Sequence, residues 1–125
     1  MYPFFRSLLF RLSPEQAHLL TLRLMRLSGQ VGLLGKLVRA MYPVAEKPVH
    51  VFGLSFKNPV GLAAGYDKDG IAWRGLTCLG FGHIEIGTVT LKPQPGNPRP
   101  LWFRLAEDRA LISRRGFSGS GSTYV

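Results

Sequence analysis

The first forty residues place apolar side chains at the spacing of amphipathic helices. The longest of these helices has a complete start signal: Ser13 is the N-cap, Pro14 takes the first helical position and Gln16 completes a capping box. Gly29 is the expected C-terminal stop of that helix. The pattern predicts three helices, over residues 2–12, 14–28 and 31–41, the last being the weakest.

The predicted helix over 14–28 is apolar on more than one side. Its stripe is wider than a single core-facing surface needs. We therefore expect something apolar to cover a second side, such as lipid, a ligand or a partner helix. The apolar positions are Ala17, Leu19, Leu20, Leu22, Leu24, Met25 and Leu27.

Beyond residue 41 the pattern changes to that of short strands. Two apolar runs that flank a helical segment are typical of buried parallel strands. Together they predict one β-α-β unit, which is the building block of parallel barrels and doubly wound sheets. The predicted order is a linker at 42–48, a hairpin at 49–57, a strand at 60–65, a helix at 71–79, a strand at 83–87, a Pro-rich loop at 90–100 and an extended segment at 101–105.

Length and charge narrow the class of protein. The 125 residues suit one domain, and a complete (β/α)₈ barrel of roughly 250 residues does not fit. The formal net charge is +9, and residues 1–40 hold six basic side chains against one acid, which favours a membrane-surface element. A basic chain also suits nucleic acid. However, zinc-finger spacing, RNA-binding aromatic motifs and a recognition-helix pattern are missing, so we expect no nucleic-acid partner.

Candidate chemistry lies where the two predicted strands end, because active sites of parallel sheets form at their C-terminal edge. The loop at 64–70 offers small residues for close approach of a flat ligand and Lys68 as a positive charge. The loop after the second strand offers the hydroxyl of Thr88. Two plainer interpretations stay open: a solvated Lys68 beside a helix start at Asp67 or Asp69, and a Thr88 that bonds only to local backbone.

Three further side chains have reactive or metal-binding chemistry. The surroundings of Cys78 favour a buried structural thiol over a nucleophile. His18 and His83 have no second metal ligand at a usable spacing, so no metal site is predicted. A surface position is the favoured interpretation of His18.

Several motifs that follow one another in a fixed order give the sequence a specific resemblance to one family. FKNPVGLAAGYDKDG at 56–70 and GFGHIEIGTVT at 80–90 resemble the opening of the dihydroorotate dehydrogenase barrel, and segments at 92–100, 103–105 and 112–117 continue the resemblance. The motif SPEQAH at 13–18 is similar to the helical extension of the membrane-associated, quinone-using class 2 enzymes. A soluble class 1 enzyme is disfavoured by these N-terminal helices.

The resemblance implies an α/β fold, the start of a (β/α)₈ TIM barrel preceded by a small N-terminal helical domain. Residues 1–45 would form the membrane and quinone-tunnel domain, and 46–125 the first part of an incomplete FMN-binding barrel. The family oxidises dihydroorotate to orotate in pyrimidine (UMP) biosynthesis, with FMN as cofactor and a membrane quinone as electron acceptor. The implied location is peripheral, on an anionic membrane surface at the cytoplasmic face of a bacterial inner membrane, or at the mitochondrial inner membrane in a eukaryote.

Site residues follow from motif positions in the resemblance. His18 and Arg104 would line the quinone tunnel, with Arg104 bonding a quinone oxygen. The family's catalytic base lies beyond Val125, so this chain offers no catalytic residue. The cofactor-binding residues would be Ala64, Gly65, Tyr66, Asp67, Lys68 and Thr88. The substrate-binding residues would be Lys68, Ser113, Arg114, Arg115, Gly116 and Phe117.

The chain departs from the family pattern in its substrate loop and in its length. Ser113 and Ser118 stand where the family carries Asn, and Arg115 replaces an apolar or aromatic residue. The chain stops after about two barrel strands, so we expect an N-terminal fragment that alone neither holds FMN tightly nor turns over. The alternative is a non-catalytic membrane-surface-binding module with a vestigial barrel segment.

Overall fold

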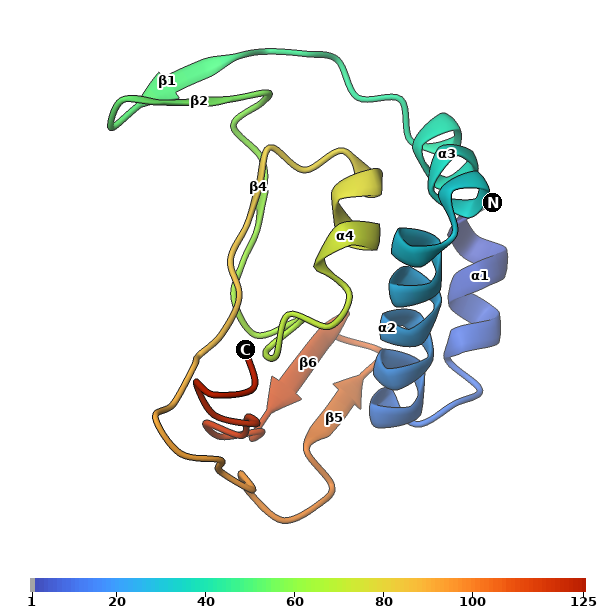
Figure 1. The fold of residues 1–125 in the computed structure, drawn as a ribbon. Helices are drawn as coiled ribbons and strands as arrows, with labels where there is room; N and C mark the ends of the chain where they lie inside the picture. Colours follow the sequence, from blue (N-terminus) through green and yellow to red (C-terminus); the bar gives the residue numbers. More distant parts are fainter. Residues whose placement is uncertain (1) are drawn as a thin grey trace.

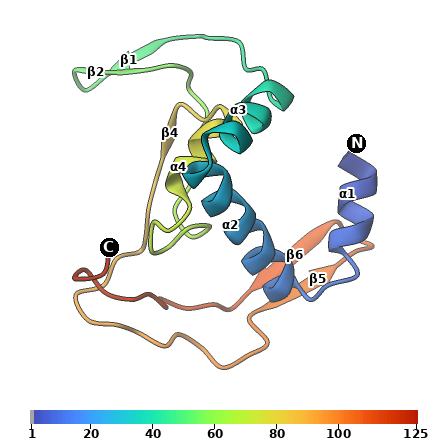
Figure 2. The ribbon, with the colours of Figure 1, turned by 45° about the vertical axis from the view of Figure 1, so that its right-hand side comes forward.

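The computed structural model describes residues 2–125, and its N-terminal third is helical as predicted. It begins with α1 (Tyr2–Leu9), α2 (Pro14–Gln30) and α3 (Gly32–Met41). The first helix ends at Leu9 instead of residue 12, and a turn leads into α2. One end of α2 lies beside the strands at 102–105 and 110–113, and its other end lies beside α3 and α4 (Trp73–Leu76) (Figure 2).

The predicted start of α2 is confirmed in detail. The Ser13 hydroxyl accepts a hydrogen bond from the Gln16 amide at 3.2 Å, and the Gln16 side chain accepts one from the Ser13 amide at 3.0 Å. Pro14 follows at the first helical position. This reciprocal capping satisfies two backbone donors that would otherwise lack partners.

The prediction that Gly29 stops α2 is wrong, because the helix continues to Gln30. The chain turns at Val31, which has extended backbone angles and separates α2 from α3. A Cβ atom at Gly29 would lie 2.6 Å from the Gly75 amide nitrogen. Gly29 therefore serves close packing of α2 against α4 (Figure 1).

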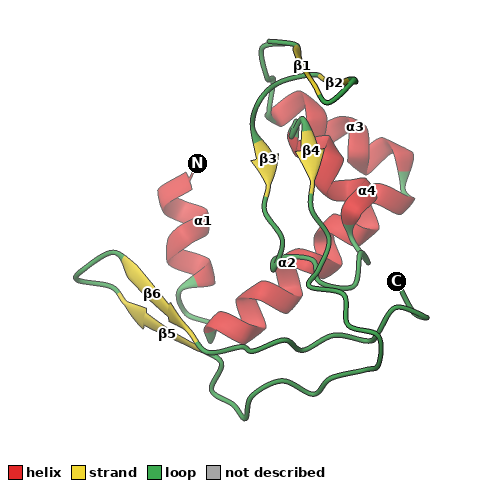
Figure 3. Cartoon of the chain, turned by 90° about the vertical axis from the view of Figure 1, so that its left-hand side faces the viewer, coloured by secondary structure: helices red, strands yellow, loops and turns green. Residues whose placement is uncertain are grey.

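The predicted β-α-β unit is confirmed. It comprises β3 (Gly61–Leu62), α4 with the short 3₁₀ helix η1 (Thr77–Leu79), and β4 (His83–Ile84), and the two strands pair in parallel (Figure 3). The strands are shorter and less buried than predicted. In residues 2–125 this sheet has two strands, and its side chains Leu62 and Ile84 pack against the small core.

Two antiparallel hairpins complete the fold. The predicted hairpin is confirmed as β1 (Val49–Val51) and β2 (Leu54–Phe56), and its turn places Phe52 and Gly53 at positive φ. The second consists of β5 (Trp102–Leu105) and β6 (Ala110–Ser113). The extended segment at 101–105 is thus confirmed, whereas β6 was not predicted.

The small core lies where α2 meets the β-α-β unit. Leu22, Ala72 and Leu76 form its buried cluster. A Cβ atom at Gly75 would overlap the Met25 carbonyl oxygen, so α2 and α4 meet backbone to backbone. Cys78 is buried with a free thiol, as predicted. The described residues form an α/β arrangement of three two-stranded sheets, none of them closed, and the TIM barrel stays a prediction.

Candidate functional site

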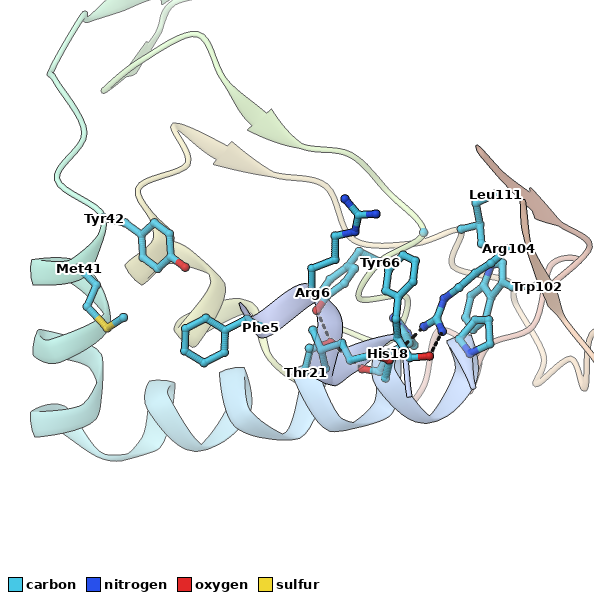
Figure 4. A pocket seen from close by; sticks show the side chains of 15 residues that line it. Phe5, Arg6, His18, Thr21, Met41, Tyr42, Tyr66, Trp102, Arg104 and Leu111 are labelled. Carbon is cyan, nitrogen blue, oxygen red and sulfur yellow. Dashed lines mark hydrogen bonds between the residues drawn. The ribbon is translucent and has the colours of Figure 1, made fainter. Parts of the chain in front are cut away.

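Among the described residues, the structure has two neighbouring cavities that are lined by predicted site residues. The larger one, of about 850 Å³, lies between α1, α2, the end of α3, the loop after β3 and the β5–β6 hairpin. Figure 4 shows Arg104, Trp102, Tyr66 and His18 gathered at one end, and Met41 with Tyr42 at the other. Most of its lining is apolar, as expected of a site for a flat or hydrophobic ligand. The lining comprises Phe5, Arg6, Leu9, Phe10, Pro14, Ala17, His18, Thr21, Met41, Tyr42, Gly65, Tyr66, Trp102, Arg104 and Leu111.

Arg104 joins β5 to the end of α1. Its Nη1 donates to the Leu12 carbonyl at 2.7 Å, and its Nη2 donates to the Leu9 carbonyl at 3.4 Å. The guanidinium carbon also lies 4.5 Å from the centre of the Phe10 ring. The Leu9 carbonyl also accepts from the Leu12 amide at 3.2 Å, so Arg104 fixes the turn that follows α1. It brings a fixed positive charge to an apolar cavity.

His18 lies among aromatic rings, and the favoured interpretation of a surface histidine is wrong. The imidazole packs edge-on against Tyr66 at 5.0 Å and Trp102 at 5.2 Å between ring centres. Its Nε2 atom is buried and has no hydrogen-bond partner among the described residues. Burial and, secondarily, the charge of Arg115 lower the pKa of His18, so the ring is neutral at physiological pH.

Tyr66 is fixed in place by helix α2. Its hydroxyl donates to the Thr21 hydroxyl at 2.8 Å, and Thr21 in turn donates to the His18 carbonyl at 3.0 Å. The chain of bonds holds the loop after β3 against α2. It sets the spacing between the rings of Tyr66 and His18.

A smaller cavity of about 410 Å³ lies next to the first. The two cavities share Gly65 and Trp102 as lining residues. The structure brings Lys68, Gly65 and most of the predicted substrate loop together here. The full lining is Gly65, Lys68, Asn97, Trp102, Ser113, Arg114, Arg115 and Gly116.

Lys68 is buried, so the interpretation of a solvated lysine is wrong. Only 8 % of its surface is exposed. Its Nζ donates to the Gly116 carbonyl at 2.6 Å and to the Ser118 hydroxyl at 3.5 Å. Burial and, secondarily, the charge of Arg115 lower the pKa of Lys68, with Asp69 acting in the opposite direction.

Asp67 and Asp69 have structural partners. The Asp67 carboxylate is almost fully buried and accepts hydrogen bonds from the amides of Ile71 at 2.9 Å and Ala72 at 2.7 Å. The prediction of a helix start at Asp67 or Asp69 is wrong, because α4 begins at Trp73 with Ala72 as its N-cap. The Asp67 carboxylate fixes the loop that precedes the helix. Asp69 accepts bonds from the amide and hydroxyl of Ser120, both at 2.9 Å.

Three other predicted residues lie outside both cavities. Ala64 is exposed, and its amide donates to the Glu85 carboxylate at 3.3 Å. Thr88 is exposed beyond β4, and Phe117 is exposed over 70 % of its surface. Their predicted contacts with FMN and substrate stay predictions.

Sequence reasoning missed Trp102, Thr21 and Asn97 as cavity residues. Trp102 had a usable signal, because alternation along a strand puts it on the same side as Arg104. Thr21 had none, since its role depends on a bond to Tyr66 from a distant loop. Asn97 lies in the Pro-rich loop and donates to the Arg114 carbonyl at 2.7 Å.

Residues 2–125 contain neither a helix that could span a membrane nor a cluster of metal ligands. No helix combines the length and apolar character needed to cross a membrane. No group of three or more His, Cys, Asp or Glu side chains is arranged to hold a metal ion.

Comparison with known proteins identifies the family. The family model described as dihydroorotate dehydrogenase matches residues 47–125. A dihydroorotate dehydrogenase (quinone) of Paraburkholderia phymatum is 54% identical over 121 residues, which are 97% of this chain and 34% of that protein. A protein of the same description from Azotobacter vinelandii is 55% identical over 125 residues, which cover 100% of this chain and 35% of the relative.

A solved structure shares the fold of this region. DHODH from Eimeria tenella in complex with ferulenol superposes with a TM-score of 0.71 at 39% identity, over 90% of this chain and 28% of that one. The chain spans about a third of the length of the curated relatives that it matches. Because the family model covers more than half of the residues, the chain belongs to the dihydroorotate dehydrogenase family.

Proposed function

We propose that the chain supplies the quinone cavity and part of the flavin and substrate sites of a dihydroorotate dehydrogenase (quinone), which oxidises dihydroorotate to orotate in pyrimidine biosynthesis. The observation that carries this proposal is the apolar cavity lined by both His18 and Arg104. Relatives described as quinone enzymes match nearly the whole chain, including its helical part. The rest of a (β/α)₈ barrel would come from the remaining length of such an enzyme.

The apolar cavity suits a quinone in shape and chemistry. A quinone combines a flat ring, two carbonyl oxygens and an apolar tail. The rings of His18, Tyr66 and Trp102 offer a flat apolar surface, and Arg104 offers a cation near it. Helix α1 borders the cavity and exposes Phe4 and Leu8. Such side chains suit the surface of an anionic membrane, where we place the protein as a peripheral protein of the inner membrane.

The loop after β3 suits one edge of FMN. Gly65 has φ +108 and open space where a Cβ would stand, so a flat ring can approach its backbone. Lys68 places a buried cation beside that loop. The carboxylate of Asp67 is occupied by backbone amides, so Asp67 would meet the cofactor through its main chain. Bound FMN would supply the hydride acceptor of the reaction.

The test is binding of a short-tailed ubiquinone analogue to the 125-residue chain, followed by tryptophan fluorescence. Changing Trp73→Phe leaves Trp102 as the only tryptophan, and Trp102 lines the cavity. We expect quenching with Trp73→Phe and an affinity about tenfold lower when Arg104→Met is added, because a charge-assisted contact is lost.

The matched control is Arg109→Met, which removes the same charge from the exposed turn of the β5–β6 hairpin. Thermal melts show whether each variant is folded. Equal affinities of the folded Arg104→Met and Arg109→Met variants would contradict the proposal.

Exposed apolar side chains on α1 and α3 favour the alternative as well, a non-catalytic module that binds membrane surfaces. Phe4 is exposed over 71 % of its surface and Leu33 over 68 %. Both functions predict flotation with anionic vesicles. Only the enzyme proposal predicts saturable binding of the quinone analogue in the absence of lipid.

A further inference from the structure

Arg115 lies on the wall between the two cavities. Its Nη1 donates to the Gly65 carbonyl at 2.8 Å, and its guanidinium carbon lies 5.3 Å from the centre of the Trp102 ring. Gly65 and Trp102 are the two residues that line both cavities. Arg115 itself is half-buried and lines the smaller one.

The smaller cavity has an excess of positive charge. Lys68, Arg114 and Arg115 are among its lining residues, which include no carboxylate. Of the nearby acids, Asp67 is bound to the amides of Ile71 and Ala72 away from the cavity lining, and Asp69 offsets only part of the charge of Lys68 and Arg115. Cations that share a partly buried site repel each other. An anionic ligand would relieve that repulsion.

Arg115 has hydrogen-bond donors to spare. A guanidinium carries five N–H groups, and among the described residues only the Gly65 carbonyl accepts from this one. Its planar fork matches a carboxylate. Ser113 and Ser118, in contrast, each offer a single short hydroxyl on the substrate side.

We propose that the Arg115 side chain binds the carboxylate of a flat anionic substrate in the smaller cavity and selects it over the same ring without the carboxylate. The contacts with Gly65 and Trp102 hold the guanidinium in place for this contact. The inference rests on the proposed function and deepens it, because it assigns the recognition of the substrate's charge to one side chain.

The test compares orotate with uracil, which has the same ring and lacks the carboxylate. Each probe is titrated into the 125-residue chain that carries Trp73→Phe, with Trp102 fluorescence as readout. We expect the wild-type loop to prefer orotate, and Arg115→Met to reduce that preference about tenfold. Arg115→Lys keeps the charge without the planar fork and should lie between them. Arg109→Met, the matched loss of charge on the hairpin turn, should leave the preference unchanged.

The ratio of the two affinities separates recognition of charge from a structural role. A residue that only supports the cavity would weaken both probes alike and leave the ratio intact. An unchanged ratio in Arg115→Met would therefore overturn the inference, and so would a wild-type loop without preference for orotate. Should Arg115→Met fail to fold, the inference is tested on the chain with Arg115 intact, by following the ¹⁵N-edited NMR signal of the Arg115 Nε–H group. It must shift with orotate and stay still with uracil, and any other result overturns the inference.

Binding of the quinone analogue in the same samples distinguishes this inference from the proposed function. If the analogue binds but orotate is not preferred, the role of Arg115 alone is overturned. If the chain binds neither the analogue nor orotate, the proposed function is contradicted too.

Discussion

The two cavities share Gly65 and Trp102 but are built by different means. Side chains of helices and of the β5–β6 hairpin form the larger one, and its lining is mostly apolar. Loops held together by hydrogen bonds from Lys68, Asn97 and Arg115 form the smaller one. The larger cavity should therefore depend on helix packing, and the smaller one on charge. Changes to packing, protonation and salt should affect them separately.

Gly75→Ala should have the largest effect and break the packing behind the apolar cavity. A methyl group at Gly75 would overlap the Met25 carbonyl oxygen, which cannot move without disturbing α2. We expect a loss of about 3 kcal/mol in the free energy of unfolding, measured by urea denaturation. Gly32→Ala, whose Cβ would meet nothing within 4 Å, is the control and should be neutral or slightly stabilising. Equal stability of the two variants would contradict this account of α2–α4 packing.

Glu15→Gln should loosen the hairpin from α2 to a lesser extent. The Glu15 carboxylate accepts bonds from the amides of Leu101 at 2.7 Å and Trp102 at 3.4 Å. We expect a loss of about 1 kcal/mol at pH 7. The same change at exposed Glu107, in the hairpin turn, should cost nothing measurable.

The pH dependence of stability tests whether the ionised Glu15 carboxylate stabilises the fold. The Leu101 amide, the largest contributor, lowers the pKa of Glu15 below its usual 4.5. Its stabilising contribution is therefore complete above pH 4.5 and is lost as the pH falls through the folded-state pKa. Glu15→Gln should remove this part of the acid transition. An unchanged acid transition would contradict the role given to the carboxylate.

His18 should make the apolar cavity sensitive to mild acid. Its pKa is lowered, mainly by burial, so the unfolded chain takes up a proton first as the pH falls below about 6.5. We expect a loss of less than about 1 kcal/mol between pH 7 and pH 5. His18→Phe should remove this loss, whereas a change at exposed His50 should leave it in place. If the loss of stability persists in His18→Phe, it comes from another titratable group and the role given to His18 is contradicted.

Salt should have the smallest effect and sharpen the comparison. Raising the ionic strength screens the charges around the smaller cavity, so the affinity for orotate should fall about threefold between 0.1 and 0.5 M sodium chloride. Binding of the quinone analogue to the apolar cavity should hold or rise slightly. Calorimetric titrations measure both, and a parallel fall of the two affinities would contradict the assigned difference.

The sequence allowed good predictions where the cause is local. The capping box at Ser13 depends on neighbours within one turn. The pairing of β3 with β4 depends on a short strand–helix–strand spacing. The role of Gly29 depends on Gly75, which is distant along the chain, so a packing glycine was interpreted as a helix stop. β6 escaped prediction because its turn lacks glycine and asparagine, and Arg109 takes the positive φ instead.

The candidate site shows the same division. The motifs led to His18, Arg104 and Lys68, and the structure places each of them in the wall of a cavity. The burial of Lys68 was not visible in the sequence, because its acceptor on Gly116 lies 48 residues away. The contact of Arg115 with Gly65 is equally distant, at 50 residues.

The most direct test of the two-cavity account is an NMR experiment on the 125-residue chain with a short-tailed ubiquinone analogue and orotate present together. The account predicts nuclear Overhauser contacts from the quinone ring to His18, Tyr66 and Trp102, and an orotate-dependent shift of the Arg115 Nε–H signal that leaves those contacts in place. Contacts confined to exposed side chains such as Leu33 on α3, or displacement of the quinone by orotate, would contradict it.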